Sequence, residues 1–205
     1  MAAPVPVILL SGPVGVGKTS TGDEQSEVLI ERDIPHTYLV LDQLTYTHPR
    51  PKDDPWGDRL ALRHLEAIWR NARAAGARNL VIAQVVETGD FVAALCAVIP
   101  GAEAQMFQLH APLPTLHERV RKREIGSGLD WNLNRAGELL AILTRPEAPC
   151  AARIDTDVQC GRSPLSWPTG STGAEDARGP SARRTLNGIE RECAPERCTA
   201  AKIEI

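Results

Sequence analysis

The sequence lacks the features that mark several common protein classes. Its five cysteines are an odd number without a CxxC pair, so neither a disulfide scaffold nor a four-cysteine zinc site is indicated. Lys and Arg together number 23 against 26 Asp and Glu, and this small acidic excess argues against a nucleic-acid-binding protein. No apolar run reaches the roughly 18 residues that span a bilayer. We therefore expect no nucleic-acid partner and no membrane partner.

The N-terminal stretch, MAAPVPVILLSG, is apolar but does not have the composition of a signal peptide. The first basic residue is Lys18, and Pro4 and Pro6 interrupt the apolar run. We expect a cytoplasmic protein whose cysteines are free thiols.

Short apolar runs alternate with helix-length stretches, which is typical of an α/β protein with a parallel sheet. Strands are expected at residues 5–11, 36–42, 79–86, 104–109 and 152–156. Helices are expected at residues 18–32, 58–75, 89–98, 114–124 and 133–144. The stretch 45–57 contains three prolines and is a long irregular connection of the kind that often carries function.

The composition changes near Val158. In residues 158–205, Gly, Pro, Ser and Thr make up 17 of 48 positions, and no strand or helix period is sustained. We predict that residues 1–157 form the domain and residues 158–205 a C-terminal tail of low order. Two origins of the tail are left open: a natural flexible extension, and a segment translated in a shifted reading frame.

Residues 12–19 read GPVGVGKT and match the pattern G-x-x-x-x-G-K-[ST] of a phosphate-binding loop, in the required place between a strand and a helix. Glycines let successive backbone N–H groups face phosphate oxygens, and the N-terminus of the following helix adds a positive end. Lys18 is expected to bind the β- and γ-phosphates of ATP, and the Thr19 hydroxyl to hold Mg²⁺. The predicted nucleotide contacts are Gly12, Pro13, Val14, Gly15, Val16, Gly17, Lys18, Thr19 and Ser20.

The motifs of other classes of nucleotide-binding protein are absent from this sequence. No N/T-K-x-D sequence for guanine is present, and the D-x-x-G match at residues 54–57 falls in the proline-rich stretch rather than after the third strand. The third apolar run is followed by Gln84 rather than by the Asp-Glu pair of an AAA-type motor. A small-molecule kinase fits the motifs best.

Four short segments of the chain together resemble motifs of the adenylate-kinase-like group of P-loop kinases. This group includes gluconate, shikimate, adenylylsulfate and chloramphenicol kinases. The segments are GPVGVGKT, LDQL at residues 41–44, LHERVRKRE at 116–124 and RIDTD at 153–157. The resemblance covers residues 4–157 and extends to kinase-like ATP-binding proteins of actinobacteria. It implies a three-layer P-loop sandwich whose five-stranded parallel sheet has the strand order 2-3-1-4-5 and helices on both faces. ATP and Mg²⁺ would bind at the carboxyl ends of the strands.

The resemblance also implies roles for individual residues. Asp42, at the end of the second strand, would orient or deprotonate the acceptor hydroxyl, with a cap of the strand end as the alternative. Arg119 and Arg123, one helical turn apart, would cover the ATP phosphates, with a solvated basic helix face as the alternative. Arg135 is a further candidate for this role, and residues 126–128 (GSG) would form the hinge of a lid.

The sequence predicts few protein ligands for Mg²⁺. Where kinases with a complete Walker B motif carry Asp, this chain has Gln84, and Glu87 lies three residues further on. Thr19, waters and phosphates would then hold the metal, with Asp42 or Glu87 bonded to its waters.

The predicted activity is transfer of the γ-phosphoryl group of ATP to a hydroxyl of a small molecule that enters near Asp42 and the stretch 45–57. Two other functions are left open, a regulatory ATPase without transfer activity and a toxin-like kinase of a sugar nucleotide. Trp56 and Trp131 either stack on a bound ring or anchor their loops. The sequence does not identify the acceptor, and a monomer or a homodimer is expected.

Overall fold

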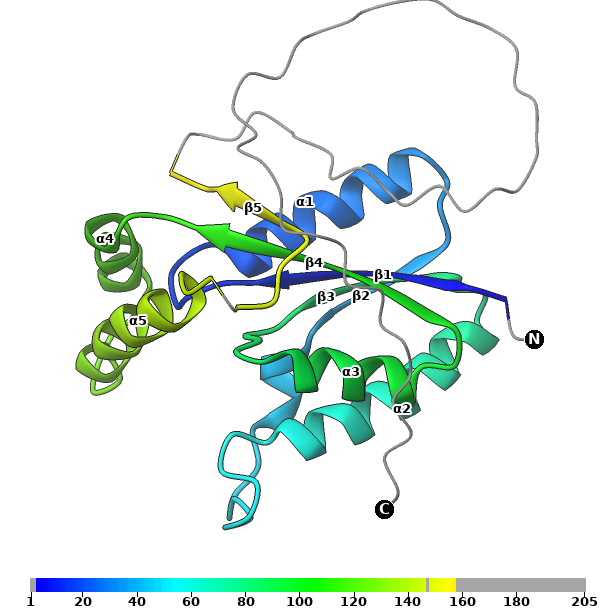
Figure 1. The fold of residues 1–205 in the computed structure, drawn as a ribbon, viewed down its shortest axis with the longest axis horizontal. Coiled ribbons are helices and arrows are strands. Elements are labelled where there is room, and N and C mark those ends of the chain that lie inside the picture. The colour runs from blue at the N-terminus through cyan, green and yellow to red at the C-terminus, as the bar shows by residue number, and fades with distance from the viewer. Residues whose placement is uncertain (1–2, 147, 158–205) are drawn as a thin grey trace, which may run out of the picture.

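Five parallel strands form one sheet in the structure, a computed structural model that describes residues 3–146 and 148–157 (Figure 1). The strands are β1 (Val5–Ser11), β2 (His36–Val40), β3 (Asn79–Ala83), β4 (Ala102–His110) and β5 (Ala152–Asp155). Their order across the sheet is β2-β3-β1-β4-β5. This confirms the predicted fold class and strand order, and it places β1 at the centre, where its apolar side chains are covered on both faces.

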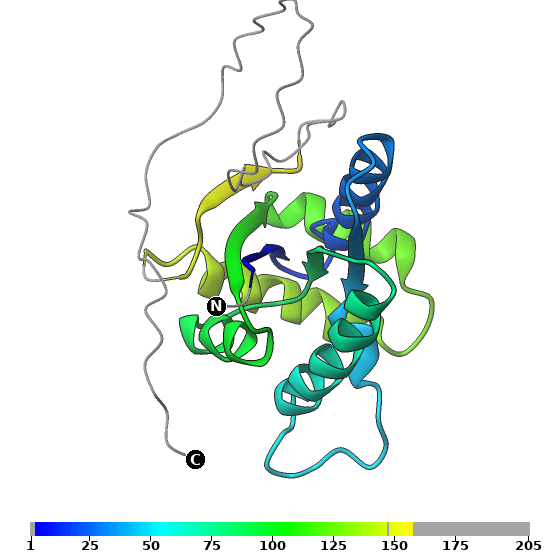
Figure 2. The ribbon, with the colours of Figure 1, turned by 90° about the vertical axis from the view of Figure 1, so that its right-hand side faces the viewer.

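Helices cover both faces of the sheet. They are α1 (Lys18–Glu31), α2 (Asp58–Ala74), α3 (Gly89–Val98), α4 (Leu113–Arg123) and α5 (Leu129–Leu143), with a 3₁₀ helix η1 (Leu41–Thr45) after β2. Figure 2 shows α1 on one side of the sheet and α2 and α3 on the other. None of the described helices is both long and apolar enough to cross a bilayer.

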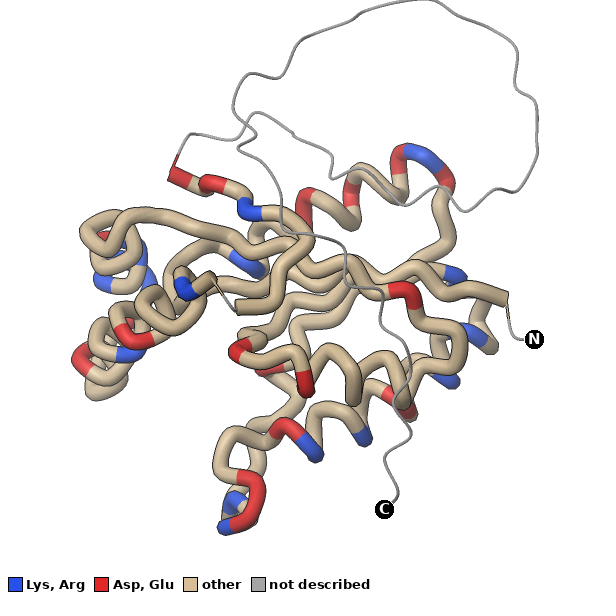
Figure 3. Tube along the Cα trace, viewed as in Figure 1, with Lys and Arg blue, Asp and Glu red and all other residues tan. Residues whose placement is uncertain are grey.

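Two apolar layers hold the sandwich together. Alternate residues of the strands face α2 and α3, where Leu9 and Ile82 pack with Leu65. The intervening residues face α1, where Leu10 packs with Leu29. Charged residues lie mainly on the helices and loops, whereas β1, β2 and β3 carry none (Figure 3).

A third apolar cluster fixes the end of the sheet where the strands finish. Val16 of the phosphate-binding loop packs there with Leu116 of α4 and Ala136 of α5. Figure 1 shows α4 and α5 beyond the carboxyl ends of the strands, with the connection 46–57 at the same end on the side of α2. Loops from distant parts of the sequence therefore meet at this one edge.

Several predicted boundaries were wrong by a few residues. The second strand ends at Val40 rather than at residue 42, because Thr45 Oγ1 donates to Asp42 O at 2.9 Å and the chain turns into η1. The third strand ends at Ala83 rather than at residue 86, because the Val86 N–H donates to Ser11 Oγ instead of extending the sheet. The fifth helix begins at Leu129, four residues earlier than expected. The predicted tail, residues 158–205, lies outside the described residues.

Candidate functional site

The loop at residues 12–19 forms a tight turn between β1 and α1 in which two glycines leave no room for a side chain. Gly12 has φ 151° and Gly15 has φ 83°. A Cβ on Gly12 would lie 2.7 Å from Leu109 O, and a Cβ on Gly15 would lie 2.8 Å from Leu116 O. The loop is therefore pressed against the end of β4 and against α4, with its backbone shaped as a phosphate cradle requires.

Lys18 begins α1, and its side chain folds back over the loop. Nζ donates to Gly12 O at 3.0 Å and to Pro13 O at 3.3 Å. Burial lowers the pKa of the Lys18 ammonium, and the nearby carboxylate of Asp42 opposes that shift. The loop carbonyls thus hold the only cation of residues 12–19 at the centre of the cradle.

Asp42 lies near enough to Lys18 for the two charges to interact. It lies in the first turn of η1 rather than in β2, near the Val85 backbone N–H that follows β3. Burial raises the pKa of Asp42, while the Lys18 charge and the Val85 N–H lower it. A partly buried carboxylate with a raised pKa beside an ammonium group is suited to accept a proton from a hydroxyl.

The residues near the loop fit Mg²⁺ bound largely by water and phosphate. The side chain of Thr19 is exposed in the first turn of α1, and Gln84 Oε1 is buried without a hydrogen-bond partner. Glu87 is ion-paired with Arg135. Within residues 3–146 and 148–157, no group of three or more His, Cys, Asp and Glu side chains is arranged to hold a metal ion. Mg²⁺ often uses only one or two protein ligands beside substrate phosphates, so a sparse donor set fits it.

The two arginines predicted to act together on α4 have different surroundings. Arg119 donates to Val16 O at 3.3 Å, to Thr156 Oγ1 at 3.1 Å and to Thr156 O at 2.6 Å. Arg123 is exposed, pairs with Glu124 at 2.8 Å, and its charge contributes to the lowered pKa of Lys18. Arg119 thus ties α4 to the loop and to the end of β5, whereas Arg123 lies at the open side of the site.

Arg135 lies in the second turn of α5, because this helix begins earlier than expected. Its side chain connects α5 to the exit of β3 and to Trp56. Its guanidinium pairs with Glu87 at 2.5 Å and with Glu138 at 3.2 Å. The same group lies 4.8 Å above the Trp56 ring. Arg135 is therefore placed between the exit of β3 and Trp56, on a different helix from Arg119 and Arg123.

Trp56 and Trp131 remain 56% and 57% exposed, respectively. Asp54, two residues before Trp56, has a structural role, because its two carboxylate oxygens accept the Arg59 and Leu60 N–H groups at 3.3 and 3.1 Å. It therefore caps the start of α2, which explains the D-x-x-G match without a role in guanine-nucleotide binding.

Tyr38 and Gly22 were missed by the sequence analysis. The Tyr38 hydroxyl donates to Thr19 O at 2.9 Å, so β2 holds the first turn of α1 in place. A Cβ on Gly22 would lie 2.4 Å from the Tyr38 ring, so the ring reaches Thr19 only because residue 22 is glycine. A lone glycine inside a predicted helix was the available signal.

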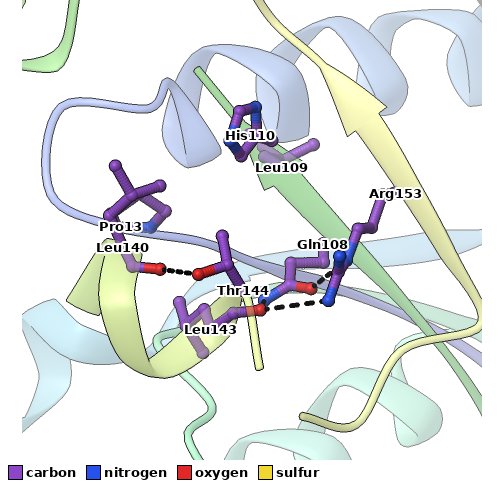
Figure 4. Close-up of a pocket in the computed structure, with 8 residues that line it drawn as sticks. All are labelled: Pro13, Gln108, Leu109, His110, Leu140, Leu143, Thr144 and Arg153. Atoms are coloured by element: carbon purple, nitrogen blue, oxygen red, sulfur yellow. Dashed lines mark hydrogen bonds between the residues drawn. The ribbon is translucent and has the colours of Figure 1, made fainter. Parts of the chain in front are cut away.

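A small hollow lies behind the loop, between β4 and α5 (Figure 4). Its volume is about 200 Å³, open solvent included, and Pro13, Leu109, Leu140 and Leu143 form its apolar walls. Two of its polar side chains bind the last carbonyl of α5. Arg153 Nε donates to Gln108 Oε1 at 3.1 Å, and both residues donate to Leu143 O (Figure 4). The hollow is thus bordered by the cap that ends α5.

Comparison with solved structures identifies the fold. The Mycobacterium tuberculosis APS kinase, in complex with AMPPNP and APS, superimposes with a TM-score of 0.53 at 21% identity, over 76% of this chain and 91% of that one. The chain has the fold of P-loop small-molecule kinases. A sugar kinase from Janibacter and the tunicamycin resistance protein of Deinococcus radiodurans each give a TM-score of 0.50, at 19% and 21% identity, over 75% of this chain and 87% of theirs. No family model matches the chain, and neither does any curated protein.

Proposed function

We propose that the protein is an ATP-dependent phosphotransferase that moves the γ-phosphoryl group of ATP to a hydroxyl of a small molecule. The observation that carries the proposal is a glycine-shaped loop with Lys18 folded over it and with Asp42 near enough for the two charges to act on each other. The fold shared with small-molecule kinases supports it. The proposal also takes the protein to be cytoplasmic and either a monomer or a homodimer.

In this proposal, the backbone N–H groups of residues 12–19 bind the phosphates, and Lys18 turns from its own loop carbonyls to the β- and γ-phosphates. Asp42 orients the acceptor hydroxyl and accepts its proton. As the new O–P bond forms, the bond between the γ-phosphorus and the bridging oxygen breaks and ADP leaves. Mg²⁺, held by Thr19, neutralises charge on the phosphate oxygens when bound. Arg123, at the open side, is positioned to approach the same oxygens.

Three variants test the proposal by calorimetry with AMPPNP and Mg²⁺ and by ADP release with a panel of sugars, sugar nucleotides, nucleosides and antibiotics. Lys18→Ala removes the phosphate-binding cation, and we expect turnover to fall by about 10²–10³. Asp42→Asn should bind AMPPNP normally but lose about 10²–10⁴ in turnover. Lys122→Ala is the matched control, because Lys122 is exposed and pairs only with Glu118 among the described residues.

The outcomes separate the candidate functions. Failure of the folded wild-type protein to bind any nucleotide would contradict the proposal entirely. Binding of AMPPNP with slow ATP hydrolysis, and no transfer to any member of the panel, would favour the regulatory ATPase. Transfer to a sugar nucleotide would favour the toxin-like kinase, which has the same chemistry with another acceptor.

A further inference from the structure

Three segments bring carboxylates together on the acceptor side of the site. η1 packs closely against the start of α2, since a Cβ on Gly57 would lie 2.9 Å from Thr45 Cβ. Asp42 lies in η1 and Asp58 directly follows Gly57, so the two residues flank this contact. The third segment is the exit of β3, whose Val85 N–H lies near Asp42.

Glu87 belongs to the same group of residues. It pairs with Arg135, and Arg135 lies over Trp56, which stands two residues before Asp58. Burial and the charges of Asp54, Glu87 and Asp42 together raise the pKa of Asp58. Asp42, Asp58 and Glu87, called the acidic cluster below, therefore interact electrostatically across three segments.

The cations beside the acidic cluster already have partners. Arg135 pairs with Glu87 and with Glu138, and Lys18 is bonded to the phosphate-binding loop. In the described part of the chain Asp58 forms no ion pair. Asp58 is therefore the carboxylate of the cluster that lacks a paired cation in the described residues, and an acceptor with a carboxylate or a sulfate beside it would be repelled.

Gln84 gives evidence for a bound ligand that does not depend on the acidic cluster. Its side chain is 6% exposed, and its Oε1 has no hydrogen-bond partner among the described residues. Leu80 and Ile82 of β3 face the α2 side of the sheet. The Gln84 N–H donates to Leu10 O, so Gln84 is still paired with β1 and its side chain follows the same alternation between the two faces. Gln84 therefore points to the same side as η1 and the start of α2. A buried acceptor oxygen without a donor calls for a ligand that donates.

We propose that the acceptor carries a protonated amine beside the hydroxyl that is phosphorylated, and that Asp58 and Gln84 Oε1 bind this ammonium group while Asp42 receives the hydroxyl. This inference rests on the proposed function, because it assigns the acceptor of that site. An ammonium group has three N–H donors and no acceptor, which matches two acceptor groups in a negative environment. The exposed part of the Trp56 ring gives the carbon skeleton of the acceptor an apolar wall.

The test compares matched compounds that differ in charge. Binding of 2-deoxystreptamine, myo-inositol and quinate, and of glucosamine, glucose and gluconate, is measured by calorimetry on the full chain saturated with AMPPNP and Mg²⁺. The wild-type protein should bind an amine at least about tenfold more tightly than its neutral and anionic partners. Asp58→Asn should remove that preference. Asp130→Asn is the control, because Asp130 is likewise an Asp in the first turn of a helix, α5, and is not part of the acidic cluster.

Gln84→Leu gives a second measurement, because it removes the unpartnered oxygen and leaves every charge in place. It should weaken amine binding about tenfold more than it weakens AMPPNP binding. The inference is overturned if AMPPNP binds and no amine is preferred, or if Asp58→Asn leaves the preference intact. It is also overturned if Asp58→Asn changes the Mg²⁺ dependence of AMPPNP binding instead, since the cluster would then serve the metal. Failure of AMPPNP itself to bind would contradict the proposed function as well.

Discussion

Gly22 of α1 and Tyr38 of β2 are in direct contact, and a Cβ on Gly22 would lie 2.4 Å from the Tyr38 ring. The contact lets the Tyr38 hydroxyl reach Thr19 O at the start of α1. The orientation of the helix that carries Lys18 and Thr19 therefore depends on a residue without a side chain.

Replacing Gly22 by Ala should destabilise the protein although alanine favours helix. The clash costs about 1–3 kcal/mol, whereas the gain in helix propensity is about 1 kcal/mol. We expect a lower Tm in thermal unfolding and weaker AMPPNP binding, because α1 shifts away from Tyr38. Gly89→Ala is the control, since Gly89 also lies in a helix but a Cβ there would meet nothing within 4 Å. Equal Tm values for the two variants would show that the Tyr38 ring moves aside at no cost.

Tyr38 should make stability fall at alkaline pH. Burial, with a contribution from the Asp23 charge, raises its pKa from 10.0 to about 12. The folded chain then keeps the phenol proton to a higher pH than the unfolded chain, so the free energy of unfolding decreases between about pH 10 and pH 12.

Urea unfolding across this pH range, for the wild type and for Tyr38→Phe, measures the effect. The variant should lose the part of the decrease that Tyr38 causes. Phenolate absorbance in Tyr46→Phe isolates the titration of Tyr38, the other tyrosine of the chain. A midpoint near pH 10 in that variant would be the contrary result.

Arg119→Lys should destabilise the protein in the absence of nucleotide. Lysine lacks the planar group that reaches both Val16 O and Thr156, and a lost hydrogen bond from a charged donor is worth about 1.5–3 kcal/mol. Arg121→Lys on the same helix is the control, because Arg121 is exposed and should change stability by no more than about 0.5 kcal/mol. If Arg119 served the phosphates alone, the two variants would be equally stable without nucleotide and differ only in AMPPNP binding.

The sequence predicted what depends on local pattern. The loop 12–19 was found because its glycines and Lys18 are contiguous, and the central strand because its residues are apolar without alternation. The strand order came from the resemblance to P-loop kinases and was confirmed by the sheet. The roles of Lys18, Asp42, Arg119 and Arg123 in catalysis stay predictions.

Contacts between distant segments could not be predicted. Nothing in the spacing of Arg135 and Glu87 shows that α5 pairs with the exit of β3, and the basic stretch of α4 does not reveal that Arg119 turns to Thr156. The boundary at Val40 was missed because residues 36–42 are apolar enough for a strand, whereas the turn into η1 depends on a hydrogen bond from Thr45. Tertiary packing decided each of these cases.

The two parts of the proposed site lie on different faces of the sheet, with the central strand β1 between them. The predicted phosphate-binding helix α1 packs on one face of the sheet and is held by Tyr38 of β2, whereas η1 and the start of α2 belong to the layer on the opposite face. If the proposed function holds, the acceptor side can change in sequence without altering the contacts that position the predicted phosphate-binding loop. The same division makes residues 46–57 a natural place to graft foreign loops when engineering enzymes on this scaffold.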